Sequence, residues 1–396
     1  MSSATALASA FPAIDSAIDR ALAENRIVGA VVLVARDGEI VYRRAAGLAD
    51  RERAIPMRED AVFRLASLTK PLVTAAALRM VEFGRIALAD PVTKYLPDFR
   101  PALPSGEIPA ITLRHLLTHT AGLSYGFMQP PDGSYHRAGV SDGAAEPGVS
   151  MDENLAQIAR AGLAYSPGEQ WAYSVAIDVV GAVLQVAEGA DLDTVMRKYV
   201  TAPLGLGSMG FELEPGQLDL LVTPYADAQP APVRIPDSGM RVRFPDGVPV
   251  YAGLAGINLA PARVFDKSSF RSGGGGMVGN AGDMLTFIEA IRTGGAPIVS
   301  RETATAMMTA QTGDFLIVNR GPGWAFGYGG SILTDPAAAL TPQSPGTFGW
   351  GGVWGHSWFI DPVKKLSAVS LSNTALEGMM GRYIRDVRDG IYANLG

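Results

Sequence analysis

Residues 62–83 read VFRLASLTKPLVTAAALRMVEF, and the second half of this stretch has the spacing of a helix. Apolar residues recur there at positions 72, 75, 76, 80 and 83, which places them on one helical face. Pro71 fits the first turn, where a backbone N–H has no partner inside the helix, and Gly84 ends the pattern. The sequence therefore predicts a helix over 71–83, with Ser67 at its N-terminal end.

Ser67 and Lys70 are the chemically interesting pair in this stretch. Residues three apart share a helical face, so the Ser67 hydroxyl and the Lys70 amine can come within hydrogen-bonding distance. A neighbouring base turns a hydroxyl into a useful nucleophile, and the N-terminal end of a helix favours a developing negative charge. Because the S-x-x-K spacing also occurs by chance, a capping serine beside a solvated lysine remains the alternative.

The composition limits the classes of function. The chain has 396 residues, of which 47% are hydrophobic and 18% charged, so it can bury a large core. A formal net charge of -6 argues against nucleic acid as the main partner. There is no cysteine, which excludes disulfides and thiolate chemistry. His115 and His119 are four apart but have no H-E-x-x-H motif or nearby carboxylate, so we expect no metal and no cofactor.

The N-terminal residues 1–11 lack the basic start and the long apolar core of a secretion signal. We therefore expect the protein to be cytoplasmic. No stretch of the sequence reaches the roughly 20 apolar residues that span a bilayer, so we expect no membrane span.

Both ends of the chain carry strand patterns. Near the start, an amphipathic helix over 11–24 precedes two apolar, β-branched runs, 28–35 and 39–46, joined at Asp37-Gly38, a dipeptide that favours a tight hairpin turn. Near the other end we expect three strands, over 324–333, 353–360 and 365–373. A last helix should follow them, because Met380, Tyr383, Ile384, Val387 and Ile391 share one helical face.

Strands from both termini suggest one antiparallel sheet with covering helices, and therefore an α/β (α+β) fold. We expect two domains, an α/β domain formed by 1–87 and 266–396 and a mainly helical domain inserted at 88–265. Helical patterns in the insertion cover 113–118, 152–161, 176–188 and 191–200. Two long Gly/Pro-rich stretches, 122–150 and 224–261, either form the walls and a lid of a pocket above Ser67 or are plain surface linkers.

Three further features deserve weighing beside the serine. Tyr173 lies on a loop just before the helix at 176, and its hydroxyl can act as a base only if a cation such as Lys70 stabilises the phenolate; otherwise it is a packing residue. Gly351 and Gly352 allow a ligand or another chain to approach a strand backbone, or they mark a bulge. Residues 272–279 contain G-x-G-x-x-G, but no βαβ unit surrounds it, so we expect close backbone packing behind a site rather than a nucleotide.

Together, Ser67-x-x-Lys70, Tyr173-Ser174 and Trp350-Gly351-Gly352 resemble, in that order, the motifs of the family VIII carboxylesterases, which share the fold of class C β-lactamases and DD-peptidases. Residues 113–123, 167–174 and 351–359 are similar as well. The resemblance implies a β-lactamase/transpeptidase-like fold in which Ser67 is acylated and Lys70 and Tyr173 act together as its base. It also implies an oxyanion hole made by the backbone of Ser67 and Val353 and a substrate-binding strand at Trp350, Gly351 and Gly352.

This sequence departs from the β-lactamase pattern at two positions. Trp350 stands where those enzymes have the lysine of Lys-Thr-Gly, which removes a cation from the pocket, so Lys70 must carry more of the task of holding Tyr173 ionised. Val175 stands where they have the asparagine of Tyr-Ala-Asn, and valine cannot bond a side-chain amide. An indole wall favours neutral, apolar groups. We therefore expect a serine carboxylesterase acting on small-molecule short-chain acyl or acetyl esters.

Two alternatives stay open at this point. The first is a β-lactamase or D-amino-acid peptidase of the same fold. The second is a penicillin-binding-like module that has kept the fold without catalysis. The missing lysine and asparagine count against the first, and the intact Ser67, Lys70 and Tyr173 count against the second.

Overall fold

The computed structural model describes residues 11–145, 147–244 and 251–395. The expectation for the first ten residues, and parts of those for 122–150 and 224–261, therefore lie outside the described residues. An eight-stranded sheet forms the centre of the molecule, in the order β10-β11-β12-β13-β14-β1-β2-β3. Its neighbouring strands are antiparallel.

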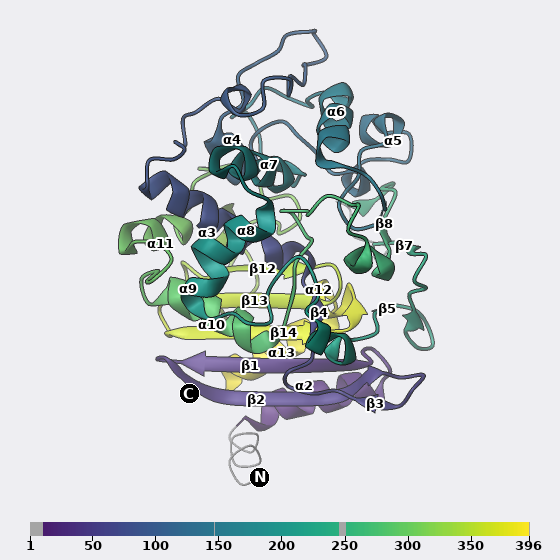
Figure 1. The fold of residues 1–396 in the computed structure, drawn as a ribbon. Coiled ribbons are helices and arrows are strands. Elements are labelled where there is room, and N and C mark those ends of the chain that lie inside the picture. The colour runs from purple at the N-terminus through teal and green to yellow at the C-terminus, as the bar shows by residue number, and fades with distance from the viewer. Residues whose placement is uncertain (1–10, 146, 245–250, 396) are drawn as a thin grey trace.

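The sheet combines the two ends of the chain, as expected. From the N-terminal part come β1 (Gly29–Arg36), β2 (Glu39–Asp50) and β3 (Ile55–Pro56), and from the C-terminal part come β10 (Trp324–Phe326), β11 (Ser331–Leu333), β12 (Phe348–Gly352), β13 (His356–Asp361) and β14 (Leu366–Ser372). In Figure 1 the purple β1 lies beside the yellow β14, and the two pair from Ala30↔Ser372 to Arg36↔Leu366. The predicted antiparallel sheet and fold class are confirmed.

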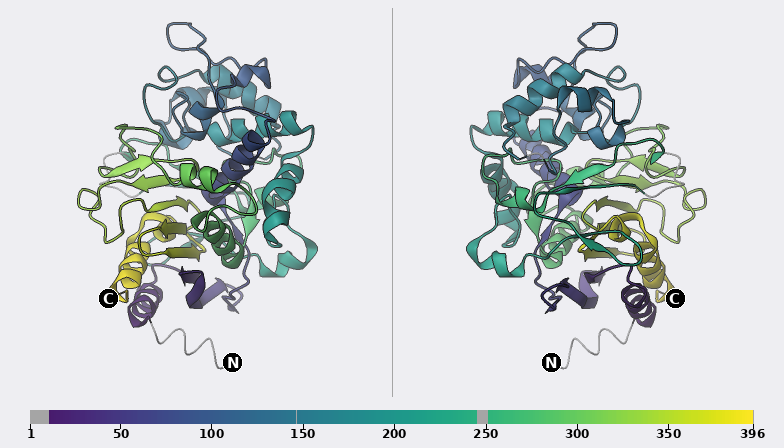
Figure 2. Two further views of the ribbon diagram at one scale, coloured as in Figure 1. Left: turned by 90° about the vertical axis from the view of Figure 1, so that its left-hand side faces the viewer. Right: turned by 90° about the vertical axis from the view of Figure 1, so that its right-hand side faces the viewer.

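Alternation along β1 explains why helices cover both faces. Val31, Leu33 and Ala35 join the main core, which contains α3 (Thr69–Glu82) and α10 (Ala281–Arg292), whereas the alternate residues Ala30, Val32 and Val34 join a second cluster. That second cluster contains residues of α2 (Pro12–Ala23) and α13 (Arg382–Ala393), which lie side by side in Figure 2. Since successive side chains of a strand point to opposite faces, a strand covered on both faces is apolar throughout.

The hairpin between β1 and β2 turns where the sequence predicts. Asp37 has φ 56° and Gly38 has φ 94°, the left-handed values that a tight hairpin turn needs and that the Asp-Gly dipeptide tolerates. The final helix was placed one turn too early, because Met380 ends a separate short helix, α12 (Glu377–Met380).

Two strand predictions near the C-terminus were wrong in their boundaries. The predicted strand over 324–333 is two strands, β10 and β11, separated by a tight turn that contains Gly329 and Gly330. The predicted strand over 353–360 begins only at His356, and the glycine-rich residues before it form a strand of their own, β12. Glycine weakens strand patterns because it has no side chain to pack, so β12 was read as the start of its neighbour.

The middle of the chain is blue to teal in Figure 1, where its first helices lie at the top and its last two lie lower on the left. Its helices are α4 (Leu113–Leu117), α5 (Ser134–Ala138), α6 (Met151–Ala161), α7 (Ala176–Glu188), α8 (Leu192–Met196) and α9 (Ala202–Leu204), with a π-helical turn at Arg197–Thr201. The predicted helix over 191–200 is thus α8 followed by that turn. The division into two domains stays a prediction.

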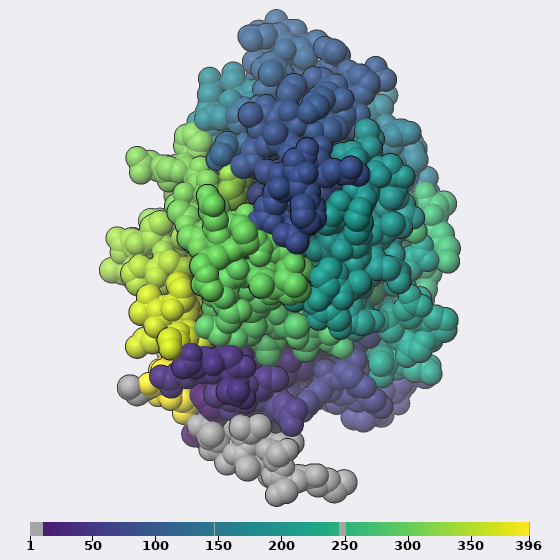
Figure 3. Space-filling view, turned by 60° about the vertical axis from the view of Figure 1, so that its left-hand side comes forward, coloured from purple at the N-terminus to yellow at the C-terminus, as the bar shows by residue number. Residues whose placement is uncertain are grey.

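The remaining elements are short: β4 (Phe63–Arg64), β5 (Tyr225–Ala226), β6 (Val233–Arg234), β7 (Met240–Val242), β8 (Ile257–Leu259), β9 (Val278–Gly279), α11 (Arg301–Met307) and β15 (Thr374–Ala375). Figure 3 shows the first and last parts of the chain in contact at one end of the molecule. Among the helices of the described residues, none is long and apolar enough to cross a membrane.

Candidate active site

Ser67 lies in a short 3₁₀ helix, Ala66–Leu68, that leads directly into α3. The helix begins at Thr69, two residues before the predicted start, so Lys70 and Pro71 both lie in its first turn. Ala66 has φ 47°, a left-handed conformation that costs energy for a residue with a Cβ. This bend in front of Ser67 places its hydroxyl in a pocket that Ala66, Ser67 and Tyr173 help to line.

The structure brings together the three side chains that the sequence singled out. Lys70 Nζ lies 3.2 Å from Ser67 Oγ, and Tyr173 Oη lies 2.6 Å from the same oxygen. Tyr173 comes from the loop before α7, 106 positions further along the chain. The Ser67 oxygen is therefore in contact with an amine from its own helix and a phenol from the middle segment.

Lys70 is 1% exposed and is held from several sides. Its ammonium donates to the backbone carbonyl of Gly274 at 2.6 Å. It also lies 4.7 Å from the ring centre of Tyr173 and 5.2 Å from that of Tyr125, within the range of a cation–π contact. The solvated lysine of the alternative reading is therefore excluded.

Asp178, on α7, fixes the carbonyl that receives Lys70. Its Oδ1 accepts the backbone N–H of Gly274 at 3.1 Å and the hydroxyl of Ser272 at 2.6 Å. Burial raises the pKa of Asp178, against the opposing influence of Ser272 and of the positive charge of Lys70. A Cβ on Gly274 would lie 2.5 Å from Asp178 Oδ2, so only glycine lets the two segments approach so closely.

The glycine run at 272–279 thus packs against α7, as the sequence analysis expects, but it also supplies a contact of the site. A Cβ on Gly273 would lie 2.6 Å from the carbonyl oxygen of Ile177. Gly274 and Gly275 line the pocket beside Ser67. The run is therefore part of the wall rather than a layer behind it.

Trp350 replaces a cation with a neutral donor. Its indole N–H donates to Tyr173 Oη at 3.2 Å, and the two rings lie 5.2 Å apart. Because the lysine is missing at this position, we expected Lys70 to carry more of the task of supporting the phenol oxygen. The structure adds a second contact, since Trp350, at the lysine's position, donates to the same oxygen.

Strand β12 passes close to the serine. A Cβ on Gly352 would lie 2.7 Å from the carbonyl oxygen of Leu65, whereas one on Gly351 would meet the flexible Met379 side chain. Val353 follows the strand and lines the pocket with Ser67. Within the part of the chain that the structure describes, the backbone N–H groups of Ser67 and Val353 donate to no other group.

The two long Gly/Pro-rich stretches supply much of the pocket wall, so within their described residues they are not plain surface linkers. The wall is largely aromatic, and only one carboxylate, that of Asp142, is among the described residues that line it. Beyond those already named it includes Tyr125, Phe127, Met128, Gly143, Ala144, Phe244, Tyr251, Ile257, Asn319, Arg320, Trp354, Met379 and Met380.

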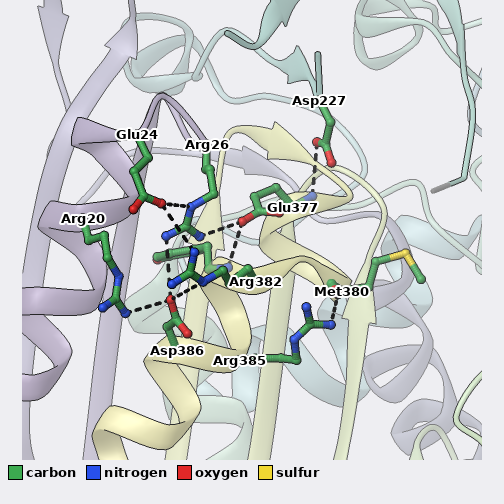
Figure 4. Close-up of polar contacts among 10 residues, drawn as sticks. Arg20, Glu24, Arg26, Asp227, Glu377, Met380, Arg382, Arg385 and Asp386 are labelled. Atoms are coloured by element: carbon green, nitrogen blue, oxygen red, sulfur yellow. Dashed lines mark hydrogen bonds and ion pairs between the residues drawn. The ribbon is translucent and has the colours of Figure 1, made fainter. Parts of the chain in front are cut away.

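Met379 and Met380 belong to α12. A cluster of ion pairs holds α12 and α13 against α2 and the residues that follow it. The Glu377 carboxylate accepts from Arg26 at 3.0 Å and from the backbone N–H of Tyr383 at 2.8 Å. Asp227 accepts the backbone N–H of Glu377 at 3.2 Å. Figure 4 shows these contacts close to Met380, so the cluster positions one edge of the pocket.

A ring of aromatic side chains holds the Tyr173 phenol in place. His119 lies 5.1 Å from its ring centre, Tyr125 5.0 Å and Trp171 6.4 Å. His119 also shares a hydrogen bond with Ser174 Oγ at 3.1 Å. Burial, helped by the charge of Lys70, lowers the pKa of His119 well below its usual value, so this imidazole is neutral and adds no charge beside Lys70.

Sequence reasoning missed Tyr125, Asp178, Gly274 and Arg320 as residues of the site. Asp178 gives a signal that could have been used, since a carboxylate among the apolar residues of helix 176–188 must be buried or paired. The other three have no such signal. Tyr125 and Arg320 lie in irregular segments, and Gly274 contributes only backbone atoms.

Comparison with known proteins agrees with this geometry. The family model described as Beta-lactamase matches residues 14–391. The chain is 48% identical over 381 residues to Esterase EstB of Burkholderia gladioli, which covers 96% of this chain and 94% of that protein.

Solved structures give the same grouping. The structure of EstCE1, described as a hydrolase with promiscuous acyltransferase activity, superposes with a TM-score of 0.92 at 44% identity and covers 98% of this chain and 100% of that one. Simvastatin synthase (LovD) of Aspergillus terreus, with a TM-score of 0.73 at 23% identity over 96% of this chain and 97% of that one, shares the fold. The chain therefore belongs to the beta-lactamase family, and within it to the family VIII carboxylesterase group that the motifs at Ser67, Tyr173 and Trp350 resemble.

Proposed function

We propose that this protein is a serine carboxylesterase that hydrolyses short-chain acyl or acetyl esters through an acyl-enzyme on Ser67. The observation that carries the proposal is the convergence of Lys70 Nζ and Tyr173 Oη on the hydroxyl of Ser67, at 3.2 and 2.6 Å. A hydroxyl in contact with a group that can accept its proton is activated for attack on a carbonyl. The relationship to EstB and EstCE1, an esterase and a hydrolase by name, supports the same reaction class.

In the acylation step, Ser67 Oγ attacks the ester carbonyl and its proton passes to the Lys70–Tyr173 pair. The carbonyl oxygen becomes an oxyanion, and the unused N–H groups of Ser67 and Val353 are the donors that we assign to it. When the tetrahedral intermediate collapses, the bond to the alcohol breaks and the pair returns its proton to the leaving oxygen. The products of this step are the acyl-enzyme and the free alcohol.

In the deacylation step, a water molecule takes the place that the alcohol leaves. The same pair accepts a proton from that water, which attacks the acyl carbonyl and releases the acid. Tyr173 Oη contacts Ser67 Oγ and accepts from the Trp350 indole, so it suits the role of the proton-carrying group. Lys70 keeps its ammonium between Ser67 and Gly274 and supplies positive charge.

The aromatic side chains of the described pocket wall favour small apolar groups. We assign Trp350, Gly351 and Gly352 as the substrate-facing strand. Trp350 and Gly351 line the pocket, as do the aromatic residues Tyr125, Phe127 and Tyr251. Aromatic surfaces reward apolar acyl or alcohol groups by removing them from water.

The β-lactamase or D-amino-acid peptidase alternative is less well supported. Val175, at the position of the second-motif asparagine, is 0% exposed, and it offers no polar atom to an amide side chain. Turnover of nitrocefin at a rate comparable to that of esters would reverse this preference. The hydrogen bonds that join Lys70 and Tyr173 to Ser67 argue against the non-catalytic module, because a binding protein does not need an activated hydroxyl.

A trapping experiment tests the proposal. Intact-mass spectrometry after treatment with diethyl p-nitrophenyl phosphate should show one adduct, located on Ser67 by peptide mapping. Hydrolysis of p-nitrophenyl butyrate should be lost in Ser67→Ala and kept in Ser16→Ala, whose exposed hydroxyl only contacts its own helix. Full activity of Ser67→Ala, or no adduct on the wild type, would refute the assignment.

A further inference from the structure

Arg320 is a cation at the rim of the proposed ester pocket. It lies in the segment before β10 and lines the same pocket as Ser67 and Tyr173. Its guanidinium carbon is 5.1 Å from the ring centre of Trp350 and 5.1 Å from that of Trp324. Two indoles from different strands therefore hold the guanidinium of Arg320 in a defined place. One of them, Trp350, also donates to the Tyr173 hydroxyl.

This arginine has no acidic partner among the described residues. Its hydrogen bond is a long one, 3.5 Å to the carbonyl of Gly349, and none of the ion pairs of the described residues includes it. Arg26, Arg44 and Arg271, by contrast, each contact a carboxylate. A guanidinium has several N–H donors, and most of those of Arg320 have no acceptor among the residues that the structure describes.

Among the described residues, no ion pair joins Arg320 to a carboxylate of the pocket. Asp142 is the carboxylate among its described lining residues, and its two oxygens accept the backbone N–H groups of Gly126 and Phe127 at 2.7 and 3.1 Å. Those contacts hold Asp142 in its own loop. An exposed cation that is held in place, has no acidic partner among the described residues and lines the same pocket as Ser67 is suited to an anionic part of a ligand.

We propose that Arg320 binds a carboxylate carried by the ester substrate, so that the enzyme prefers esters with a free acid group over neutral esters of the same shape. This inference rests on the proposed esterase function and names a substrate class for the same pocket. Guanidinium and carboxylate match as planar, bidentate partners. The stacking on Trp324 and Trp350 lowers the entropy cost, because the guanidinium is already ordered.

Matched pairs of esters test the proposal. On the acyl side, mono-p-nitrophenyl glutarate is compared with p-nitrophenyl 4-carbamoylbutanoate, its neutral amide analogue. On the alcohol side, 4-acetoxybenzoate is compared with 4-acetoxybenzamide. The readout is the ratio of kcat/KM for the anionic ester to that for its neutral partner, because such a ratio cancels general losses of activity.

The wild type should prefer the anionic member of at least one pair, and Arg320→Gln should lower that ratio by about 10- to 100-fold. Arg320→Lys should keep part of the preference, because it retains the charge without the planar donors. The control is Arg100→Gln, which removes a positive charge from an exposed residue that does not line the pocket and should leave the ratio unchanged.

Each other result has a definite reading. An unchanged ratio in Arg320→Gln, or equal turnover of both members of each pair by the wild type, would overturn the carboxylate site and leave the esterase function intact. An equal loss on both members would show that Arg320 only braces Trp350. If neither member of any pair were hydrolysed, the proposed function would fail and this inference with it.

Discussion

The indole of Trp350 donates a hydrogen bond to the hydroxyl of Tyr173 at 3.2 Å, and that hydroxyl lies 2.6 Å from the Ser67 oxygen. The Tyr173 oxygen thus has contacts on two sides, the serine and the indole, with Lys70 below its ring. In relatives that carry a lysine at this strand position, a charge would serve here. The neutral donor keeps the contact while leaving the pocket wall apolar.

Trp350→Phe should lower kcat for p-nitrophenyl butyrate by about tenfold with little change in folding, because it removes one hydrogen bond to the phenol oxygen and keeps an aromatic wall. Steady-state kinetics with circular dichroism measures both. The matched control is Trp358→Phe, since Trp358 pairs with Trp350 across the strands and its indole N–H has no partner among the described residues. Equal losses in the two variants would contradict the assigned role.

The paired glycines of β12 should respond differently to alanine. Gly352→Ala would place a Cβ 2.7 Å from the backbone oxygen of Leu65, so β12 must move away from the serine segment, and we expect at least about a tenfold loss in kcat. A Cβ in Gly351→Ala would lie 2.6 Å from Cγ of the flexible Met379 side chain and 3.1 Å from the carbonyl oxygen of His356, a milder backbone contact than that of Gly352→Ala, so this variant should retain more activity. Equal tolerance of both variants in kinetic and thermal-unfolding measurements would show that strand and serine need not be so close.

Asp178 should act by positioning Gly274 and, through it, Lys70. Asp178→Asn keeps an oxygen for the Gly274 N–H and should lose about threefold to tenfold in kcat, whereas Asp178→Ala removes the acceptor and should lose about 100-fold. The KM for a neutral ester should change little in either variant, because Asp178 is not among the described residues that line the pocket. A wild-type kcat in Asp178→Ala would show that Asp178 does not position Gly274 and Lys70 for catalysis.

His356 should make the fold sensitive to acid. Burial lowers its pKa to about 4 from 6.5, although the carbonyls of Arg64 and Gly355 partly oppose this. Between these values the unfolded chain binds a proton that the folded chain does not, so stability is lost as the pH falls from about 6.5 to about 4, by roughly 3 kcal/mol at most.

Urea unfolding of the wild type and of His356→Gln at a series of pH values checks this expectation. Above pH 7 the two free energies of unfolding should run parallel, because the histidine is neutral in both states. Below about pH 6.5 the wild type should lose stability faster than the variant. Parallel curves down to about pH 4.5 would show that His356 does not contribute.

Much of the architecture follows from local patterns. The run at 28–46 with its Asp37-Gly38 turn predicted the β1–β2 hairpin, and the apolar run at 365–373 predicted β14. The sequence could not show that β12 is a separate strand, because all five residues in 348–352 are glycine or aromatic, and the three glycines have no side chain to mark a buried face. It also joined Met380 of α12 to α13 in one predicted helix, because Met380 continues the helical spacing of Tyr383, Ile384 and Val387.

The sequence predicted the residues of the site that have reactive side chains, but not those that act through backbone atoms or through packing. Ser67, Lys70 and Tyr173 each have a reactive group and a local context, and they do meet. Gly274 takes part through a carbonyl oxygen, and Arg320 through a position that depends on how two tryptophans pack. Such contributions depend on long-range packing, which periodicity and spacing do not encode.

The pairing of β1 with β14 also affects how the protein is made. A ribosome delivers β1 more than 300 residues before its neighbour β14, so the nascent chain must hold an apolar strand without its partner for most of its synthesis. Contacts that distant in sequence slow folding. Heterologous production should therefore benefit from slow expression or added chaperones, and chains cut short before residue 366 should aggregate rather than hydrolyse esters.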